Sequence, residues 1–296
     1  MSSQLTRITL SSRPERAAFL DSRSSIAFAW LLMTASTMAH GDMHEQIVAV
    51  TVEIQREPGN AALYLKRAEL HRLHQDWVAA AEDYNRAAQL NPNLSAVHLG
   101  RGKTLHESGH GLEAAAELDL FLEQNPNHVD GLITRARSLM KCAPPLAAAS
   151  DFARAIEISP RPEPETYVEH AQALAAAEKP AAAVRTLDEG MTRLGPLPAL
   201  GLYAIELEVQ QRRFDAALCR IDRLRNSMNR QETWLERRGD ILAQSDRTGA
   251  ARESYQAALK ALATLPAHIR GTKSMAELEA RLVQKLCDLE RRGADL

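Results

Sequence analysis

The sequence predicts an all-α protein, a solenoid of repeated helix-turn-helix units with a capping helix at each end. The first observation is its composition: 49 Ala and 39 Leu supply most of the apolar side chains, whereas aromatic residues make up only 4% of the 296 residues. Ala and Leu are strong helix formers, and a β-sandwich or barrel needs more β-branched and aromatic residues. The second observation is that prolines recur at a fixed spacing, and the third is that small and large side chains recur with the same period.

The charge and the length of the chain exclude some classes of protein. Charged residues of both signs make up 25% of the chain, which argues against a wholly disordered protein. The formal net charge of −2 provides no general electrostatic basis for nucleic-acid binding. A chain of this length corresponds to about two average domains or to one elongated domain. We therefore expect a folded helical protein with no nucleic-acid partner.

The first element of the chain is a basic segment followed by an apolar one. An uncharged stretch runs from Ser24 to Ala39, and four arginines precede it: Arg7, Arg13, Arg16 and Arg23. Thr37 and Ala39 supply small residues at the −3 and −1 positions of a cleavage site. This pattern is typical of a secretory signal peptide, and the apolar stretch is shorter than the roughly 20 residues that a membrane span needs. The sequence therefore predicts a signal peptide over residues 1–39.

Cleavage after Ala39 implies an exported protein, periplasmic or extracellular, with no stable membrane insertion after the signal peptide is removed. An uncleaved N-terminal membrane anchor and a cytosolic extension remain the alternatives. Cleavage changes the net charge from −2 to −4, because four basic and two acidic residues are removed. Cys142, Cys219 and Cys287 are too few and too widely spaced for a disulfide framework. The core must therefore hold the chain together.

A period of 34 residues organises the middle of the chain. It separates four prolines: Pro58, Pro92, Pro126 and Pro160. Proline marks helix boundaries, and a fixed period of this size indicates a repeat architecture. Aligned on these prolines and continued at the same period after one extra residue, residues 61–265 form six repeats. The repeats start at Ala61, Ser95, Val129, Pro164, Pro198 and Glu232.

Residue types at equivalent positions of the six repeats support the alignment. Position 20 is always alanine: Ala80, Ala114, Ala148, Ala183, Ala217 and Ala251. Position 8 is mostly small: Ala68, Gly102, Ala136, Ala171, Ile205 and Gly239. Position 24 is large and apolar: Tyr84, Leu118, Phe152, Leu187, Ile221 and Tyr255. Helix breakers fall between positions 14 and 17, so each repeat is a helix, a tight turn and a second helix, with small residues where the helices approach closely.

This pattern resembles the tetratricopeptide repeat (TPR), most clearly in YLKRAELH and WVAAAEDYNRAAQLNP of the first repeat. The likeness covers residues 61–265; Ile205 at position 8 and the missing position-32 proline in the last three repeats depart from it. The resemblance implies a right-handed superhelical solenoid whose first helices line a concave groove for a protein or peptide partner. A solenoid also needs capping helices at its ends. We expect an N-terminal cap within residues 40–60 and a C-terminal amphipathic cap within residues 266–296.

A charge pattern repeats in the first three units. Position 7 is arginine and position 23 is an acid in the pairs Arg67 and Asp83, Arg101 and Glu117, and Arg135 and Asp151. The acid is lost in the last three repeats, where position 23 is Thr186, Arg220 and Ser254. We predict that an arginine–carboxylate pair joins the two helices of each N-terminal repeat.

Two short strings match catalytic or binding motifs in letters only. His106-Glu107-Ser108-Gly109-His110 matches the HExxH zinc-peptidase string, but Gly109 falls at the predicted turn, so His110 should leave the helix before it can face His106. Gly100-Arg101-Gly102-Lys103-Thr104 resembles part of a phosphate loop but lacks the earlier glycine and a preceding strand. We expect no catalytic site and no cofactor. The alternative is a metal-binding or metal-dependent hydrolytic protein that uses His40 and His44 or the His106-Glu107-His110 string.

The resemblance places the groove at positions 2, 5, 9, 12 and 13 of the first helices, and positions 5 and 9 supply the candidate residues. Position 5 is largely apolar: Leu65, Leu99, Ile133, Val168, Leu202 and Glu236. Position 9 is polar: Glu69, Lys103, Arg137, Gln172, Glu206 and Asp240. We expect a groove that is basic across the second and third repeats and acidic across the fifth and sixth, which suits an extended or helical peptide. The alternative is that position 5 belongs to the core and that these charges only solvate the surface.

Overall fold

A computed structural model describes residues 43–226 and 228–294, which contain helices and no strands. The predicted all-α solenoid is therefore confirmed. The helices of the six hairpins are α2 (Ala61–Leu73) and α3 (Trp77–Leu90), α4 (Ala96–Glu107) and α5 (Gly111–Gln124), α6 (Val129–Leu139) and α7 (Pro145–Ile158), α8 (Pro164–Ala176) and α9 (Pro180–Leu194), α10 (Pro198–Gln210) and α11 (Phe214–Asn226), and α12 (Glu232–Gln244) and α13 (Thr248–Ala263). A helix over residues 43–56 precedes them, and α14 (Ala267–Arg270) and α15 (Lys273–Ala294) follow.

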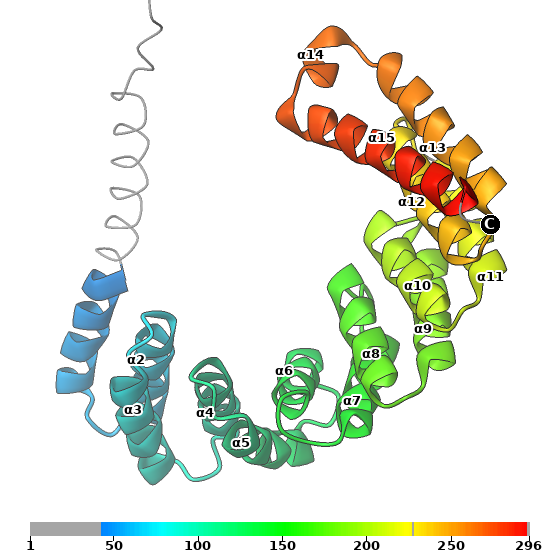
Figure 1. Cartoon of the computed structure of the whole chain (residues 1–296). Helices are drawn as coiled ribbons and strands as arrows, with labels where there is room; N and C mark the ends of the chain where they lie inside the picture. The colour runs from blue at the N-terminus through cyan, green and yellow to red at the C-terminus, as the bar shows by residue number, and fades with distance from the viewer. Residues whose placement is uncertain (1–42, 227, 295–296) are drawn as a thin grey trace, which may run out of the picture.

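The hairpins stack side by side into an open arc (Figure 1). From α4 to α11 the first helix of each hairpin lies on the inner side of the arc and the second helix on the outer side. We call this concave side, formed by the first helices of the hairpins, the inner face. The helix over residues 43–56 covers one end of the stack, and α15 covers the other. The predicted signal peptide, residues 1–39, lies outside the described residues.

Close contact between the two helices of a hairpin depends on small side chains. The alanines at position 20 are fully buried in all six repeats, as are five of the large residues at position 24. A Cβ added to Gly102 would lie 2.5 Å from Cγ of Leu118, and one added to Gly239 would lie 2.4 Å from Cε1 of Tyr255. Atoms cannot approach this closely, so the position-24 side chain occupies the space that a larger residue at position 8 would need.

Each hairpin turn uses a left-handed residue, except the third. The residue at position 15 has a positive φ in five repeats, from 58° to 89°: Gln75, Gly109, Glu178, Arg212 and Asp246. The amides of this residue and the next one donate hydrogen bonds to carbonyls in the last turn of the first helix, which ends that helix and starts the reversal. The third hairpin turns instead through Ala143, Pro144 and Pro145.

The predicted arginine–carboxylate pairs are confirmed in the first three hairpins. Nε of Arg67 lies 2.7 Å from Oδ2 of Asp83, and Nη2 of Arg135 lies 2.6 Å from Oδ1 of Asp151. The pair of Arg101 with Glu117 is looser, at 3.7 Å. The hydrogen bonds that Arg67 donates to Asp83 and Arg135 donates to Asp151 raise the pKa values of both arginines, although partial burial opposes this effect.

The last three hairpins use other contacts at these positions. His170 and Thr186 face each other at 3.5 Å, and burial lowers the pKa of His170 to about 4, so this pair is neutral. Arg220 turns to Glu208 at 2.8 Å and also pairs with Asp188 of the preceding hairpin. Ser254 donates a hydrogen bond to the carbonyl of Leu235 at 2.9 Å.

The end helices bury apolar side chains against the stack. Val50 and Ile54 of the helix over residues 43–56 are buried, and Thr51 accepts a hydrogen bond from Arg67. In α15 the residues Met275, Leu278, Leu282 and Leu289 are buried against α12 and α13. Both end helices therefore cover apolar surface of the terminal hairpins, which a stack of amphipathic hairpins requires.

Replacement of Gly102 by alanine should destabilise the protein by about 1–3 kcal/mol, because the new methyl group overlaps Leu118. Gly249 is the matched control: it lies in α13 with open space around its Cα, so alanine there should be neutral or stabilise by up to about 1 kcal/mol. Urea unfolding followed by circular dichroism measures both changes. Equal effects of the two substitutions would contradict the packing argument.

Replacement of Arg135 by methionine should lower stability by about 1–3 kcal/mol, because the buried Asp151 carboxylate loses its partner. Arg154 is the control, since its pair with Glu157 lies on the surface and should contribute less than about 1 kcal/mol. The same unfolding experiment compares Arg135→Met with Arg154→Met. The pair is not structural if both substitutions have the same small effect.

Candidate functional site

All ten residues that the sequence assigned to a groove lie on first helices of the hairpins: α2, α4, α6, α8 and α10. Six of them are half-buried: Leu65, Glu69, Leu99, Lys103, Ile133 and Val168. Four are exposed: Arg137, Gln172, Leu202 and Glu206. Position 5 therefore belongs partly to the packing between repeats in the first four hairpins. It becomes open surface only in the fifth, where Leu202 is 44% exposed.

Ion pairs connect neighbouring first helices along the N-terminal half of the inner face. Arg72 of α2 pairs with Glu107 of α4 at 2.5 Å. Lys103 of α4 pairs with Asp130 of α6, also at 2.5 Å, and Arg137 of α6 donates two hydrogen bonds to Glu169 of α8 at 2.9 and 3.1 Å.

These pairs correct the expectation of a basic groove. Lys103 and Arg137 are cations at position 9, but each is balanced by a carboxylate of the following repeat. The partner Asp130 occupies position 2, which the resemblance placed in the groove without predicting a pair, and Glu169 occupies position 6, which it did not include. Across the second and third repeats the inner face therefore presents ion pairs rather than a run of unbalanced cations.

Position 9 has a structural role in the first and last repeats. The hydroxyl of Tyr84 donates a hydrogen bond to Glu69 at 2.7 Å, and that of Tyr255 donates one to Asp240 at 2.8 Å. Both tyrosines occupy position 24, so the residue that fills the hairpin also holds the acid of the inner face. Burial and the neighbouring Glu69 raise the pKa of Tyr84, which keeps the hydroxyl a donor.

A hollow of about 280 Å³ lies on the inner face between α4, α6 and α8. Its lining includes His106, Arg137, Met140, Lys141, Glu169 and Gln172. Partial burial lowers the pKa of His106, and the positive charges of Lys141 and Arg137 lower it further. Nδ1 of His106 lies 2.9 Å from the hydroxyl of Ser138. His106 is thus a neutral hydrogen-bonding residue of the stack at pH 7.

The two strings that match motifs in letters, residues 106–110 and 100–104, form a hairpin turn and part of a helix. Helix α4 ends at Glu107, Gly109 has a φ of 89°, and His110 lies at the start of α5 beside Ser108. No group of three or more His, Cys, Asp or Glu in the described part of the chain could hold a metal ion. His44 is exposed on the helix over residues 43–56, and His40 lies outside the described residues. Gly100–Thr104 lies inside α4, so it forms no loop around a phosphate.

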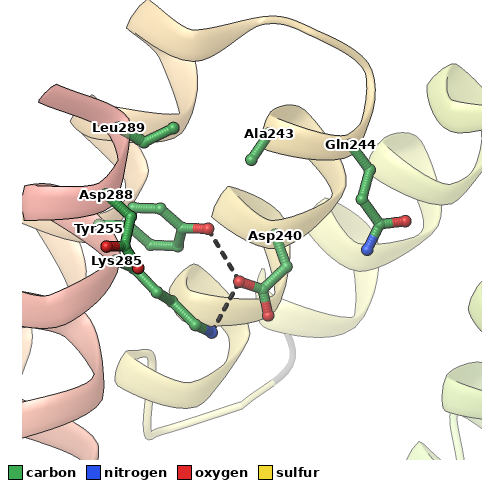
Figure 2. Close-up of a pocket in the computed structure, with 7 residues that line it drawn as sticks. All are labelled: Asp240, Ala243, Gln244, Tyr255, Lys285, Asp288 and Leu289. Carbon is green, nitrogen blue, oxygen red and sulfur yellow. Dashed lines mark hydrogen bonds and ion pairs between the residues drawn. The ribbon is translucent and has the colours of Figure 1, made fainter. Parts of the chain in front are cut away.

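The C-terminal end of the inner face is covered by the chain itself. Nζ of Lys285 in α15 lies 2.7 Å from Asp240, at position 9 of α12 (Figure 2). It also lies 2.9 Å from Glu236, at position 5 of the same helix. Arg281, one turn earlier in α15, reaches Glu236 at 3.2 Å. Burial alone would raise the pKa of Glu236, but the hydrogen bonds from Arg281 and Lys285 outweigh it and the pKa is lowered.

A hollow of about 350 Å³ adjoins this contact. Its lining includes Tyr255, Leu289, Asp288 and Gln244 as well as Asp240 and Lys285 (Figure 2). The ammonium group of Lys285 also lies 5.6 Å from the centre of the Tyr255 ring, within reach of a cation–π contact. Helix α15 thus binds the acidic end of the inner face through both charge and apolar packing.

The sequence analysis missed a second apolar surface, at the turn between the helices of the first three hairpins. Position 18 holds Val78, Leu112 and Leu146, which are 71%, 62% and 47% exposed. Val78 also lines a hollow of about 460 Å³, together with Trp77 and Leu105 among others. The signal was in the alignment, since position 18 in the last three repeats is Ala181, Asp215 and Gly249.

Comparisons with known proteins agree with this architecture. Residues 165–273 match the family described as a tetratricopeptide repeat-like domain. The C-terminal part of a TPR repeat-containing protein from Cytophaga hutchinsonii superposes with a TM-score of 0.61 at 14% identity, over 79% of this chain and 96% of that one. A tetratricopeptide repeat protein from Parabacteroides merdae gives a TM-score of 0.50 at 15% identity, over 86% and 97% of the two chains. Residues 165–273 are therefore similar to a TPR-like domain, and the chain shares the fold of helical-repeat proteins.

Two further properties bear on the class of protein. None of the helices within the described residues is long and apolar enough to cross a lipid bilayer. The cysteines Cys142, Cys219 and Cys287 are free and exposed, so the described hairpins are held together by packing, hydrogen bonds and ion pairs.

Substitution Lys285→Glu should loosen α15, because it places a third carboxylate beside Glu236 and Asp240. We expect faster backbone hydrogen exchange across the second half of α15, while α2 to α9 keep their protection. Lys273→Glu serves as the control, since Lys273 is 92% exposed at the start of the same helix. Unchanged exchange in Lys285→Glu would show that apolar packing alone holds α15.

Proposed function

We propose that the protein is a non-catalytic scaffold that binds a protein or peptide partner through its inner face. The observation that carries the proposal is the exposure of Leu202 on the inner helix α10, one turn before the exposed Glu206. Gln172 of the neighbouring inner helix α8 is exposed as well. An open apolar side chain flanked by polar ones suits a peptide surface. The TPR-like fold is consistent with this role, because stacked repeats create extended concave surfaces that bind partners.

We further propose that the protein acts outside the cytoplasm, in the periplasm or at the cell surface. The support is the basic segment, the apolar stretch from Ser24 to Ala39 and the small residues Thr37 and Ala39. Fractionation of the native host followed by N-terminal sequencing tests this proposal. A mature chain that begins at His40 in the exported fraction is expected. A full-length chain in the cytosol would overturn export, and a full-length chain in the membrane fraction would replace cleavage by an anchor.

Affinity capture from the native host, with mass spectrometry and a binding assay, tests the inner face. The substitution Leu202→Asp should weaken binding of the captured partner at least about tenfold, because it places a charge at the exposed apolar position. Leu112→Asp is the matched control, since Leu112 is equally apolar and 62% exposed but lies at the hairpin turns. A partner that tolerates Leu202→Asp and is lost with Leu112→Asp would move the binding site to the turn surface.

A further inference from the structure

The inner face of the fourth and fifth hairpins has an unusual charge balance. Helices α8 and α10 together contain four glutamates and no lysine or arginine. Two of these acids are neutralised by other helices, Glu169 by Arg137 and Glu208 by Arg220. Glu165 and Glu206 are exposed and make no ion pair with a described residue. This part of the surface is therefore acidic, unlike the paired stretch between α2 and α8.

Apolar side chains accompany the two unpaired acids. Leu202 is exposed and Val168 is half-buried at position 5, and Tyr203 is half-buried next to Leu202. Burial raises the pKa of Tyr203, and the negative charge of Glu206, three residues later in α10, raises it further. A surface that combines these apolar side chains with unpaired carboxylates is complementary to a ligand that carries both apolar and cationic groups.

The chain itself shows which kind of segment binds such a surface. In the sixth hairpin positions 5 and 9 are the acids Glu236 and Asp240, and α15 covers them with Arg281 and Lys285, one helical turn apart. The contact of Lys285 in α15 with Asp240 is drawn in Figure 2. The apolar residues Leu278 and Leu282 of the same helix are 1% and 0% exposed. In the sixth hairpin, the inner face is therefore covered by an amphipathic helix of the same chain, with two basic residues at i and i+4.

We propose that the partner of this protein presents a cationic amphipathic helix that docks on α8 and α10, beside α15. Its apolar face would cover Leu202 and Val168, and its basic residues would pair with Glu206 and Glu165. The inference rests on the proposed function of the inner face and adds the chemistry of the partner. The docked helix would make, one hairpin earlier in the arc, the same kind of contact that α15 makes with α12.

A synthetic peptide of residues 273–291, with Cys287→Ser and a fluorescent label, is a suitable probe because it carries the resident pattern of Arg281 and Lys285. Fluorescence anisotropy with the full chain should show saturable binding that weakens as salt is added. Glu206→Lys should weaken binding at least about fivefold, and Leu202→Asp should do the same. A matched peptide with Arg281→Glu and Lys285→Glu should not bind, and Leu112→Asp in the protein should leave the affinity unchanged.

Three results would overturn the inference: no saturable binding, equal binding of the charge-reversed peptide, or an affinity that is insensitive to Glu206→Lys. The last result would place the peptide elsewhere, for example in place of the resident α15. Circular dichroism of each variant checks that the fold is intact. If the peptide fails but a captured partner still loses affinity with Leu202→Asp, only the basic-helix inference falls. If the captured partner is insensitive to Leu202→Asp, the proposed function itself falls.

Discussion

Close approach of two helices is the constraint on which the rest of this structure depends. Alanine at position 20 is fully buried in every hairpin, and Gly102 and Gly239 leave room for the large residue at position 24. The two helices of each hairpin therefore pack closely, and the six hairpins stack into an arc with one inner face (Figure 1). The composition follows from the same need, because a protein built from close helix pairs uses alanine often and aromatic residues rarely.

Charges organise the two halves of the arc differently. In the first three hairpins arginine–carboxylate pairs join the helices within a unit, and further pairs link neighbouring units across the inner face. In the fourth and fifth hairpins the pair at positions 7 and 23 is absent, and the inner helices lack basic residues. Because the charged side chains of the first three hairpins pair with one another, this half of the inner face presents little net charge to a partner. The second half retains unpaired acids, and its far end is already occupied by basic side chains of α15.

The fold class could be predicted from the sequence because each packing position recurs six times, so chance matches are averaged out. The pairs at positions 7 and 23 were also predictable, since both partners lie in one repeat and recur in three. The ion pairs of Lys103 and Arg137 were not, because their partners lie at different positions of the next repeat. The left-handed residue at position 15 was hidden as well: Gln75, Glu178 and Arg212 are not typical of that conformation, and only Gly109 and Asp246 favour it.

The most direct test of the account is hydrogen exchange of the full chain with and without its captured partner. The account predicts slower exchange in the inner helices, strongest in α8 and α10, with the outer helices α5, α7 and α9 unchanged. Protection confined to the outer helices, or to the hairpin turns around Val78 and Leu112, would contradict it.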